Sequence, residues 1–386
     1  MIVNKLYTQQ KRRGIKRIIR HFLGLPWEMI LLVCVIAGIG CVTLYSAAGG
    51  KWDPWAMKQM MRFGIGFCMM IGVSLLPLRE IYHWTYSLFG LSLFLLFVVE
   101  LMGFVGMGAR RWVNLGFFQL QPSELVKITI ILAIARYFHR LTAAEARTAW
   151  APIMPLLFLM VPAALIVRQP DLGTTLMIIM VGLAMIVVAG IHKVYLVVGG
   201  IGCLAAGPLA WPFLHTYQKK RVLTFLTPEN DPLGAGYHII QSKIALGSGG
   251  LFGKGYMKGS QSYLNFLPEK QTDFIFTMIG EEWGFVGAVS LLLLYCVFFV
   301  YGYKVCWRAQ SQFARLTAFG VTTSLFLYVF VNTAMVMGVL PVVGIPLPLI
   351  SYGGTALLTL MTAFGLLFSC DAQSHTRIPT MRSQLS

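Results

Sequence analysis

The chain has few charged residues, and acidic residues are especially scarce. Only 12% of its 386 residues are charged, with 14 acidic residues against 31 lysines and arginines. About 25% of the residues in a soluble globular domain are charged. Hydrophobic residues make up 57% of the sequence. This composition excludes a soluble globular enzyme and indicates a protein that crosses a membrane many times.

Motifs for a metal centre, a disulfide framework or a phosphate-binding loop are also missing. All seven cysteines fall in or beside hydrophobic runs, which implies no disulfide framework. None of the seven histidines has the spacing of a zinc ligand. Segment 248–255 departs from the phosphate-binding loop pattern at both ends. Ser351 lacks the glycine setting of a nucleophile elbow, and capping of the tenth span is its commonest alternative role.

Ten hydrophobic stretches are long enough to cross a membrane, which takes about 20 apolar residues per helix. The expected spans are residues 27–48, 58–78, 82–102, 122–138, 152–168, 172–190, 194–214, 274–302, 316–340 and 350–370. We therefore predict an all-α integral membrane fold. One ten-helix membrane domain occupies residues 27–370, between a basic tail at 1–26 and a short tail at 371–386.

A long polar, glycine-rich loop at residues 215–273 separates the seventh and eighth spans. Short amphipathic helices are expected in it at 217–226 and 237–246. Residues 103–116 form a second irregular segment, for which an interfacial hairpin or amphipathic helix fits better than a span. Because functional residues concentrate in such connections, these two segments are the first places to look for a site.

The net charge of +17 arises from basic residues that lie mainly at the ends of the hydrophobic spans. A positive-inside bias explains this distribution, so nucleic acid is not an expected partner. The bias places both termini in the cytoplasm and the long loop outside. A cleaved signal peptide is the alternative interpretation of the basic start, but the apolar run that follows is too long for a typical signal sequence.

Ionisable side chains inside the spans are costly and therefore mark functional hypotheses. Glu124 and Lys127 are three residues apart, close enough to pair on a helix. Arg168 and Asp171 flank a tight reversal and are expected as a second pair. Arg62 needs an acidic partner from another helix, unless it snorkels to the interface. A purely structural ion pair is the alternative role for each of the two pairs.

The end of the long loop carries the leading catalytic candidate. Asp273 is the last residue of a polar run that leads directly into an apolar helix. Glu281 and Glu282 follow about two turns later. For these glutamates, packing or buried hydrogen bonding is a better prediction than catalysis.

The polar motifs resemble those of the SEDS (shape, elongation, division and sporulation) family, and are closer to its rod-shape branch than to its division branch. The resemblance rests on Gly108-Ala109-Arg110-Arg111-Trp112, Gln121-Pro122-Ser123-Glu124 with Lys127, Gln169-Pro170-Asp171-Leu172-Gly173-Thr174, Asp231-Pro232, the run from Pro268 to Phe276, and the run from Gly344 to Gly354. Gln271 departs from the pattern, which has a histidine before Thr272-Asp273. That departure weakens any role for a histidine there.

The resemblance implies a membrane glycosyltransferase that polymerises lipid II into β-1,4-linked glycan strands at the outer face of the bacterial cytoplasmic membrane, releasing undecaprenyl pyrophosphate. Asp273 would be the catalytic general base. The residues expected to bind substrate are Arg62, Arg111, Trp112, Glu124, Lys127, Asp171 and Ser351. Glu124 or Asp171 could instead hold a divalent ion, Mg²⁺ or Mn²⁺, together with Asp273.

The resemblance also implies partners. These are a class B penicillin-binding transpeptidase and other membrane proteins of the elongation complex. The rival function from another class is a lipid II flippase, which needs access from both sides of the membrane, whereas the polar residues here concentrate on one face. The division-specific branch of the family is the nearer alternative. A non-catalytic scaffold is disfavoured by the cost of so many intramembrane charges.

Overall fold

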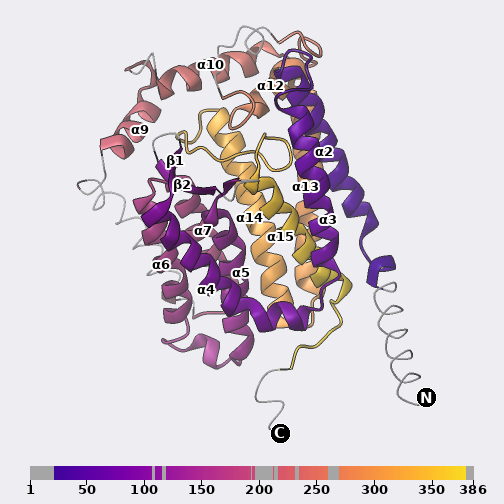
Figure 1. The fold of residues 1–386 in the computed structure, drawn as a ribbon, viewed down its shortest axis with the longest axis vertical. Helices are drawn as coiled ribbons and strands as arrows, with labels where there is room; N and C mark the ends of the chain where they lie inside the picture. Colours follow the sequence, from indigo (N-terminus) through magenta and orange to yellow (C-terminus); the bar gives the residue numbers. More distant parts are fainter. Residues whose placement is uncertain are drawn as a thin grey trace.

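The computed structural model describes residues 21–106, 109–114, 119–192, 194–195, 212, 216–230, 234–259 and 269–379. Most of this part of the chain is a bundle of long helices (Figure 1). The bundle helices are α2 (Trp27–Ala47), α3 (Ala56–Ser74), α4 (Leu78–Met102), α5 (Pro122–Arg140), α6 (Ile153–Arg168), α7 (Leu172–Val188), α13 (Gly284–Arg308), α14 (Gln312–Val336) and α15 (Thr355–Ala372). The predicted helical membrane fold is confirmed. Nearly all of the predicted seventh span, 194–214, lies outside the described residues.

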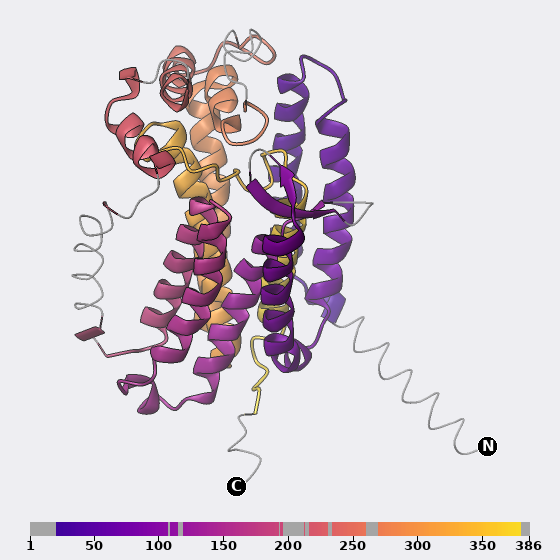
Figure 2. The same cartoon turned by 60° about the vertical axis from the view of Figure 1, so that its left-hand side comes forward.

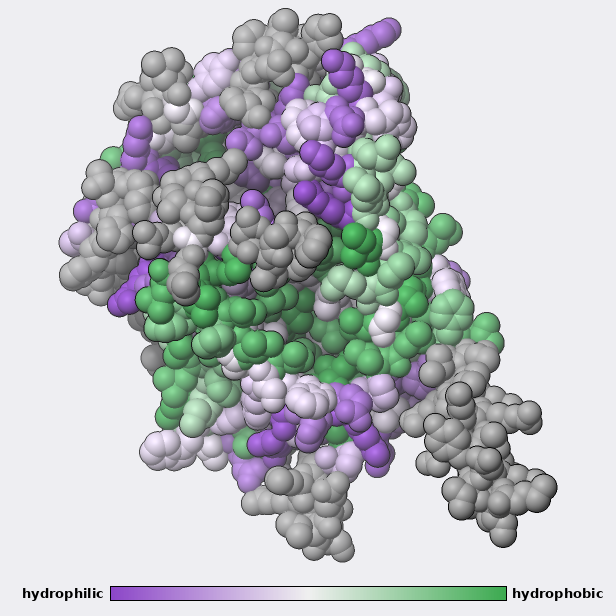
Figure 3. Space-filling view, viewed as in Figure 1, coloured by the Kyte–Doolittle hydropathy of each residue, from purple (hydrophilic) through white to green (hydrophobic). Residues whose placement is uncertain are grey.

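The helices fit a bilayer, where each backbone polar group must be bonded within its own segment. Within the described residues, α2, α4, α13, α14 and α15 are long and apolar enough to cross a membrane, while α6 and α7 are apolar but shorter. On the face shown in Figure 3, a hydrophobic belt covers the middle of the bundle and hydrophilic residues lie above and below it. That belt is the surface expected to contact lipid.

Helix α14 lies at the centre of the bundle, where it packs against α5, α7, α13 and α15. Small residues allow this close approach, as is usual between membrane helices. A Cβ atom at Gly320 would lie 2.6 Å from both Ile131 Cγ2 on α5 and Met185 Sδ on α7. The central helix therefore holds its neighbours at fixed distances and can position side chains among them.

Both ends of the described chain lie at the same end of the bundle, where α2 begins and α15 ends (Figure 1). The sheet and helices α9, α10 and α12 lie at the opposite, upper end in both views (Figures 1 and 2). This arrangement agrees with the prediction that the two termini share one side and the long loop lies on the other.

A small antiparallel sheet replaces helix between α4 and α5. Its strands are β1 (Phe104–Gly106), β2 (Ala109–Asn114) and β3 (Gln119–Leu120). Phe104 is opposite Trp112, and Val113 is opposite Leu120. Of the two predicted alternatives for residues 103–116, the hairpin is therefore confirmed.

In its described residues, the long loop contains two α-helices that lie over the upper end of the bundle (Figure 1). They are α9 (Thr216–Leu226) and α10 (Ala235–Ser248), separated in sequence by the 3-10 turn η3 (Pro228–Asn230). Both predicted amphipathic helices are thus confirmed. Helix α10 contacts α12 and α14, which connects the loop to the centre of the bundle.

The eighth predicted span, 274–302, is wrong as a single helix. It consists of a short buried helix, α12 (Ile275–Glu282), and the longer α13, which begins at Gly284 and extends to Arg308. Gly284 has a φ of +69°, a left-handed conformation that favours glycine. The backbone of the long loop fills the break, because Phe285 N donates to Gly250 O (2.9 Å) and Gly255 N donates to Glu282 O (3.1 Å).

The two glutamates at this break are buried and bonded, in agreement with their predicted structural role. Glu281 is 0% exposed and pairs with Lys254 (2.8 Å). Glu282 is 3% exposed and accepts a hydrogen bond from the Ser46 hydroxyl on α2. They join the loop, the break and α2 into one rigid unit beside Asp273.

Candidate active site

Asp273 lies in the turn immediately before α12, and its main chain is held from the centre of the bundle. Asn332 on α14 is fully buried, and its amide donates to Asp273 O (2.8 Å) and to Ile345 O (2.7 Å). One side chain thus joins the end of the long loop to the segment between α14 and α15. The buried asparagine was the available sequence signal for this contact, and the sequence prediction missed it.

The segment between α14 and α15 forms a second set of contacts with the residues before Asp273. Ser351 Oγ donates to Thr272 O (2.6 Å) and accepts from Leu347 N (2.7 Å). Tyr352 N donates to Gln271 O (2.8 Å). The capping role considered for Ser351 is wrong, because α15 begins only at Thr355. Ser351 instead joins two loops.

The carboxylate of Asp273, unlike its main chain, accepts no hydrogen bond from any residue that the structure describes. Burial, followed by the nearby Glu269 carboxylate, raises the pKa of Asp273 to about 6, while the positive charge of Arg221 on α9 opposes the shift. Gly344, with a φ of +75°, lies beside this carboxylate, since a Cβ atom there would be 3.4 Å from Asp273 Oδ2. Such a poised, unbonded carboxylate is suited to accept a proton near neutral pH.

A second polar cluster lies deeper in the bundle. Lys127 Nζ donates to Glu124 Oε1 (2.6 Å) and to the Tyr328 hydroxyl, and it lies 4.7 Å from the centre of the Tyr328 ring. Glu124 and Lys127 are 6% and 8% exposed. The predicted ion pair is confirmed, and Tyr328 is a third member that the sequence prediction missed.

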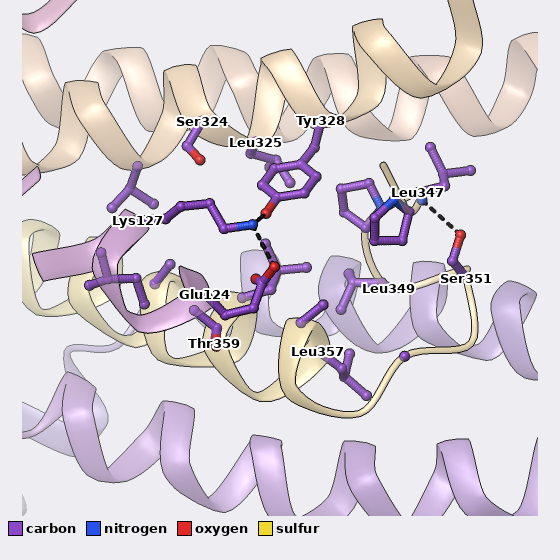
Figure 4. Close-up of a pocket in the computed structure, with 18 of the residues that line it drawn as sticks. Glu124, Lys127, Ser324, Leu325, Tyr328, Leu347, Leu349, Ser351, Leu357 and Thr359 are labelled. Carbon is purple, nitrogen blue, oxygen red and sulfur yellow. Dashed lines mark hydrogen bonds and ion pairs between the residues drawn. The ribbon is translucent and has the colours of Figure 1, made fainter. Parts of the chain in front are cut away.

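These three side chains line a pocket between α5, α14 and α15. Figure 4 shows Lys127, Glu124 and Tyr328 at one side of it, with Leu347, Leu349 and Ser351 at another. The remaining lining is largely apolar and includes Leu325, Leu357 and Leu360. Asp273 is absent from the lining, but Ser351 belongs both to the lining and to the loop bonded to Thr272. The pocket therefore extends to the underside of the loop that holds Asp273.

Helix α14 connects the two polar groups. Tyr328 and Asn332 are four residues apart on it, so they lie on the same face about one turn from each other. Tyr328 contacts Lys127, and Asn332 holds Asp273. Helix α14 therefore positions the buried cation Lys127 and, about one turn away, the segment that carries the Asp273 carboxylate.

The predicted pair of Arg168 with Asp171 is wrong. Arg168 lies at the exposed C-terminal end of α6 and pairs with Glu100 on α4 (3.6 Å). Asp171 instead caps α7, because its carboxylate accepts a hydrogen bond from Thr174 N (3.1 Å) and approaches the Gln121 amide (3.4 Å). A residue that starts a helix uses its carboxylate on that helix's free N–H groups, which separates the two charges.

Arg111 and Trp112 belong to strand β2 at the upper end. Arg111 Nε donates to Gln169 O (2.8 Å) and Nη2 donates to Pro170 O (2.6 Å). Arg111 thereby holds the reversal between α6 and α7 in place, next to Asp171. Trp112 is half-buried on the same strand. Arg111 and Asp171, two of the residues expected to bind substrate, thus lie at the same reversal.

Arg62 has no acidic partner among the described residues, contrary to the expectation from sequence. Its guanidinium lies 4.7 Å from the centre of the Tyr352 ring, and its Nη1 is buried without a hydrogen-bond partner. One turn earlier on α3, Gln59 donates to Ser351 O (3.0 Å). The face of the Tyr352 ring takes the place of the expected acid. Arg62 therefore keeps an unbonded N–H donor next to the loop that holds Asp273.

A resident divalent cation needs several oxygen or nitrogen ligands in one place. Within the described part of the chain, no three histidine, cysteine, aspartate or glutamate side chains come together. Glu124 is bonded to Lys127, and Asp171 caps α7. Neither acid is free to join Asp273, so this donor set does not fit a metal held by the protein alone.

Residues 24–376 match the family model FTSW_RODA_SPOVE, described as a cell cycle protein. The chain belongs to this family. It is 42% identical over 343 residues to the peptidoglycan glycosyltransferase MrdB of Escherichia coli strain K12, covering 88% of this chain and 92% of that protein. It is 32% identical to the peptidoglycan glycosyltransferase RodA of Treponema pallidum, covering 92% and 99%.

Solved structures share the fold of this chain. One chain comes from a structure described as "Structural coordination of polymerization and crosslinking by a peptidoglycan synthase complex", with a TM-score of 0.79 and 34% identity, covering 91% of this chain and 99% of that one. The rod shape determining protein RodA of Thermus thermophilus has a TM-score of 0.69 and 29% identity, covering 91% and 98%.

Proposed function

We propose that this protein is a peptidoglycan glycosyltransferase that polymerises lipid II into glycan strands during cell elongation. The observation that carries the proposal is the Asp273 carboxylate, which is fixed by its main chain, has no hydrogen-bond donor among the described residues and has a pKa of about 6. It occurs in a chain of the FtsW/RodA/SpoVE family, with relatives that are peptidoglycan glycosyltransferases.

The reaction needs a base at one atom and positive charge at another. Asp273 removes the proton from the 4-hydroxyl of an N-acetylglucosamine as that oxygen attacks the anomeric carbon of a lipid-linked N-acetylmuramic acid. The bond from that carbon to undecaprenyl pyrophosphate breaks, and the pyrophosphate leaves with the electron pair. One direct displacement inverts the anomeric centre and requires no covalent enzyme intermediate.

Cationic side chains stabilise the departing pyrophosphate. Arg62 has an unbonded N–H donor next to the loop that holds Asp273, and Lys127 lies in the pocket below it. Arg221 on α9, which the sequence did not predict as a site residue, is close enough to Asp273 to lower its pKa. These side chains are the proposed protein source of charge stabilisation.

The partner and location follow from the same proposal. A related chain comes from a complex for polymerisation and crosslinking, which supports a class B penicillin-binding transpeptidase as partner, together with other elongation-complex membrane proteins. The protein resides in the bacterial inner membrane with both termini in the cytoplasm. Asp273 then faces outward, where glycan strands are made.

Replacement of Asp273 by asparagine tests the proposal, because it preserves side-chain volume and removes the base. Loss of a general base typically lowers a rate about 100-fold to 10,000-fold, so purified Asp273→Asn should form almost no glycan from labelled lipid II. A carboxyl with a raised pKa makes the parent less stable as pH rises through about 6. At pH 7 the variant should therefore melt at or above the parent's temperature.

Glu269→Gln is the matched control, since it removes a neighbouring carboxylate that the mechanism does not use. It should keep a polymerisation rate close to the parent's. If Asp273→Asn polymerises lipid II at the parent's rate, the assignment of the base is wrong. A variant that still moves lipid II across vesicles, together with a parent that makes no glycan, would support the flippase function instead.

A further inference from the structure

Two arginines at the lower end of the bundle have no acidic partner among the described residues. Arg136 and Arg140 lie one turn apart at the end of α5. Each contacts aromatic rings at the start of α4. The Arg136 guanidinium lies 4.8 Å from the centre of the Tyr82 ring and 4.3 Å from that of Tyr86, and Arg140 lies 5.4 Å from that of Tyr86.

Hydrogen bonds fix the two guanidinium groups without using all of their donors. Arg136 Nη1 donates to His83 O (2.8 Å), and Arg140 Nε donates to the Tyr82 hydroxyl (3.4 Å). Arg136 Nε is buried without an acceptor, and among the described residues nothing accepts a hydrogen bond from Arg136 Nη2 or from the two Nη atoms of Arg140. A guanidinium that stacks on aromatic rings is already oriented, so it loses little entropy when its remaining N–H groups bind the oxygens of a phosphate.

The platform under the arginines is rigid. Tyr86 packs against Phe158 on α6 with ring centres 6.1 Å apart, and Phe158 also packs edge-on against Tyr137 on α5 (6.4 Å). Helices α4, α5 and α6 therefore share one aromatic cluster. A site built on such a cluster holds its geometry better than one on a loop.

The surroundings of the pair point to a lipid. Apolar side chains on the neighbouring helices are strongly exposed: Leu91 on α4 is 54% exposed and Met160 on α6 is 58% exposed. Trp84, at the start of α4, is 56% exposed, and tryptophan is enriched at membrane interfaces. Acyl chains can lie along the apolar surface while a phosphate reaches the arginines.

We propose that Arg136 and Arg140, on the platform of Tyr82 and Tyr86, bind the phosphodiester headgroup of an anionic phospholipid. The lipid belongs to the leaflet at the lower end of the bundle, which the charge distribution predicts to be cytoplasmic and which carries the anionic headgroups that basic clusters recognise. The site lies at the opposite end of the bundle from Asp273. It is therefore independent of the polymerisation chemistry.

Native mass spectrometry of the purified chain, titrated with phosphatidylglycerol, tests the site. The double variant Arg136→Gln/Arg140→Gln should bind this lipid about tenfold or more weakly, because charge-assisted hydrogen bonds to two arginines are lost. The matched control is Arg308→Gln/Arg315→Gln. It removes the same charge from two exposed arginines near the same end and should change affinity by no more than roughly twofold, as for surface charges.

Equal losses in the two double variants would overturn the proposal, because general attraction between the basic end and the lipid would explain them. So would parent-like binding by Arg136→Gln/Arg140→Gln. The variant Arg136→Lys/Arg140→Lys keeps the charge and removes the planar fork. It should lose most of the lipid selectivity, and full retention would show that fork geometry is not used.

Phosphatidylcholine and inorganic phosphate separate the sources of the ligand. Phosphatidylcholine should bind weakly to parent and variants alike, and millimolar phosphate should not displace phosphatidylglycerol, because it lacks the acyl chains that contact α4 and α6. Displacement of the lipid by an acidic peptide such as polyglutamate, at lower concentration than the lipid itself, would assign the surface to a protein partner and overturn the proposal.

Discussion

Asp273 can accept a proton only while its carboxylate is ionised, and its environment raises the pKa of that group to about 6. We expect the rate of glycan synthesis to fall by about tenfold per pH unit below this value and to level off above it. Steady-state rates with labelled lipid II across this range measure the profile.

Two neighbouring charges provide controls for that profile. Arg221→Gln removes the cation that lowers the pKa of Asp273, so the break should move to higher pH. Glu269→Gln removes an anion that raises this pKa, so the break should move to lower pH. Identical profiles for the parent and both variants would contradict the electrostatic coupling of these residues to Asp273.

Because Lys127 also contacts Tyr328, exchanging the charges of Glu124 and Lys127 tests whether their ion pair is functional or only structural. Exchanging the pair, Glu124→Lys with Lys127→Glu, keeps the two opposite charges but places a carboxylate against the ring of Tyr328, 4.7 Å from Nζ in the parent. Because the ring face carries negative charge, we expect little or no glycan synthesis in a protein that still inserts and purifies as a monodisperse species.

Tyr328→Phe is the milder companion, since it removes the hydroxyl that Lys127 contacts and keeps the ring. It should retain more activity than the exchanged pair. A fully active exchanged protein would show that Glu124 and Lys127 serve only to hold the helix.

Among the secondary-structure elements, the C-terminal end of α10 offers a matched pair of glycines, Gly247 in its last turn and Gly249 just after its last residue. A Cβ atom at Gly249 would overlap the carbonyl oxygen of Gly280 on α12, whereas one at Gly247 would meet no atom within 4 Å. Overpacking costs typically about 1–3 kcal/mol, while alanine for glycine in a helix contributes roughly 0.5–1 kcal/mol. Gly249→Ala should lower the melting temperature, and Gly247→Ala should leave it unchanged or raise it.

A thermal shift assay in detergent measures both variants. If Gly249→Ala melts with the parent, α10 and α12 are not in backbone contact, and the loop is not anchored to the residues that follow Asp273. That result would also weaken the account of how Asp273 is positioned.

Most bundle helices could be predicted because membrane length and hydrophobicity define them, whereas other details depend on tertiary contacts. The break at Gly284 was missed although two glutamates and two glycines interrupt the apolar run there, because its cause is a tertiary contact with the loop backbone at 250–255. Ser351 looked like a helix cap because serine starts helices well. The chain instead stays irregular for three more residues, up to the start of α15 at Thr355, and Ser351 contacts Thr272.

At the scale of the whole molecule, the segments that lie at the two opposite ends of the helix bundle predict the membrane topology. Lys258 lies in the long loop and Gln310 lies between α13 and α14 at the opposite end, and both are exposed. In intact cells, a membrane-impermeant thiol reagent should label Lys258→Cys and not Gln310→Cys. Labelling of Gln310→Cys alone would invert the orientation and place Asp273 on the cytoplasmic side.

The candidate site could be predicted in part from sequence, because charged residues are rare in this apolar chain and each one is therefore a functional candidate. Asp273, Lys127 and Glu124 were found in this way. Asn332 and Tyr328 were missed because a single uncharged polar residue in a membrane helix resembles many others. The partners of Arg62 and Arg168 were mispredicted because sequence spacing does not show which neighbouring helix faces each side chain.

The way in which the Asp273 segment is attached to the rest of the protein determines which substitutions it can tolerate. The contacts that position this segment end on the carbonyl oxygens of Gln271, Thr272 and Asp273, which every amino acid possesses. A substitution at residue 271 therefore leaves its carbonyl contact with Tyr352 intact. Glutamine can stand where the family pattern has histidine without displacing the aspartate two residues later.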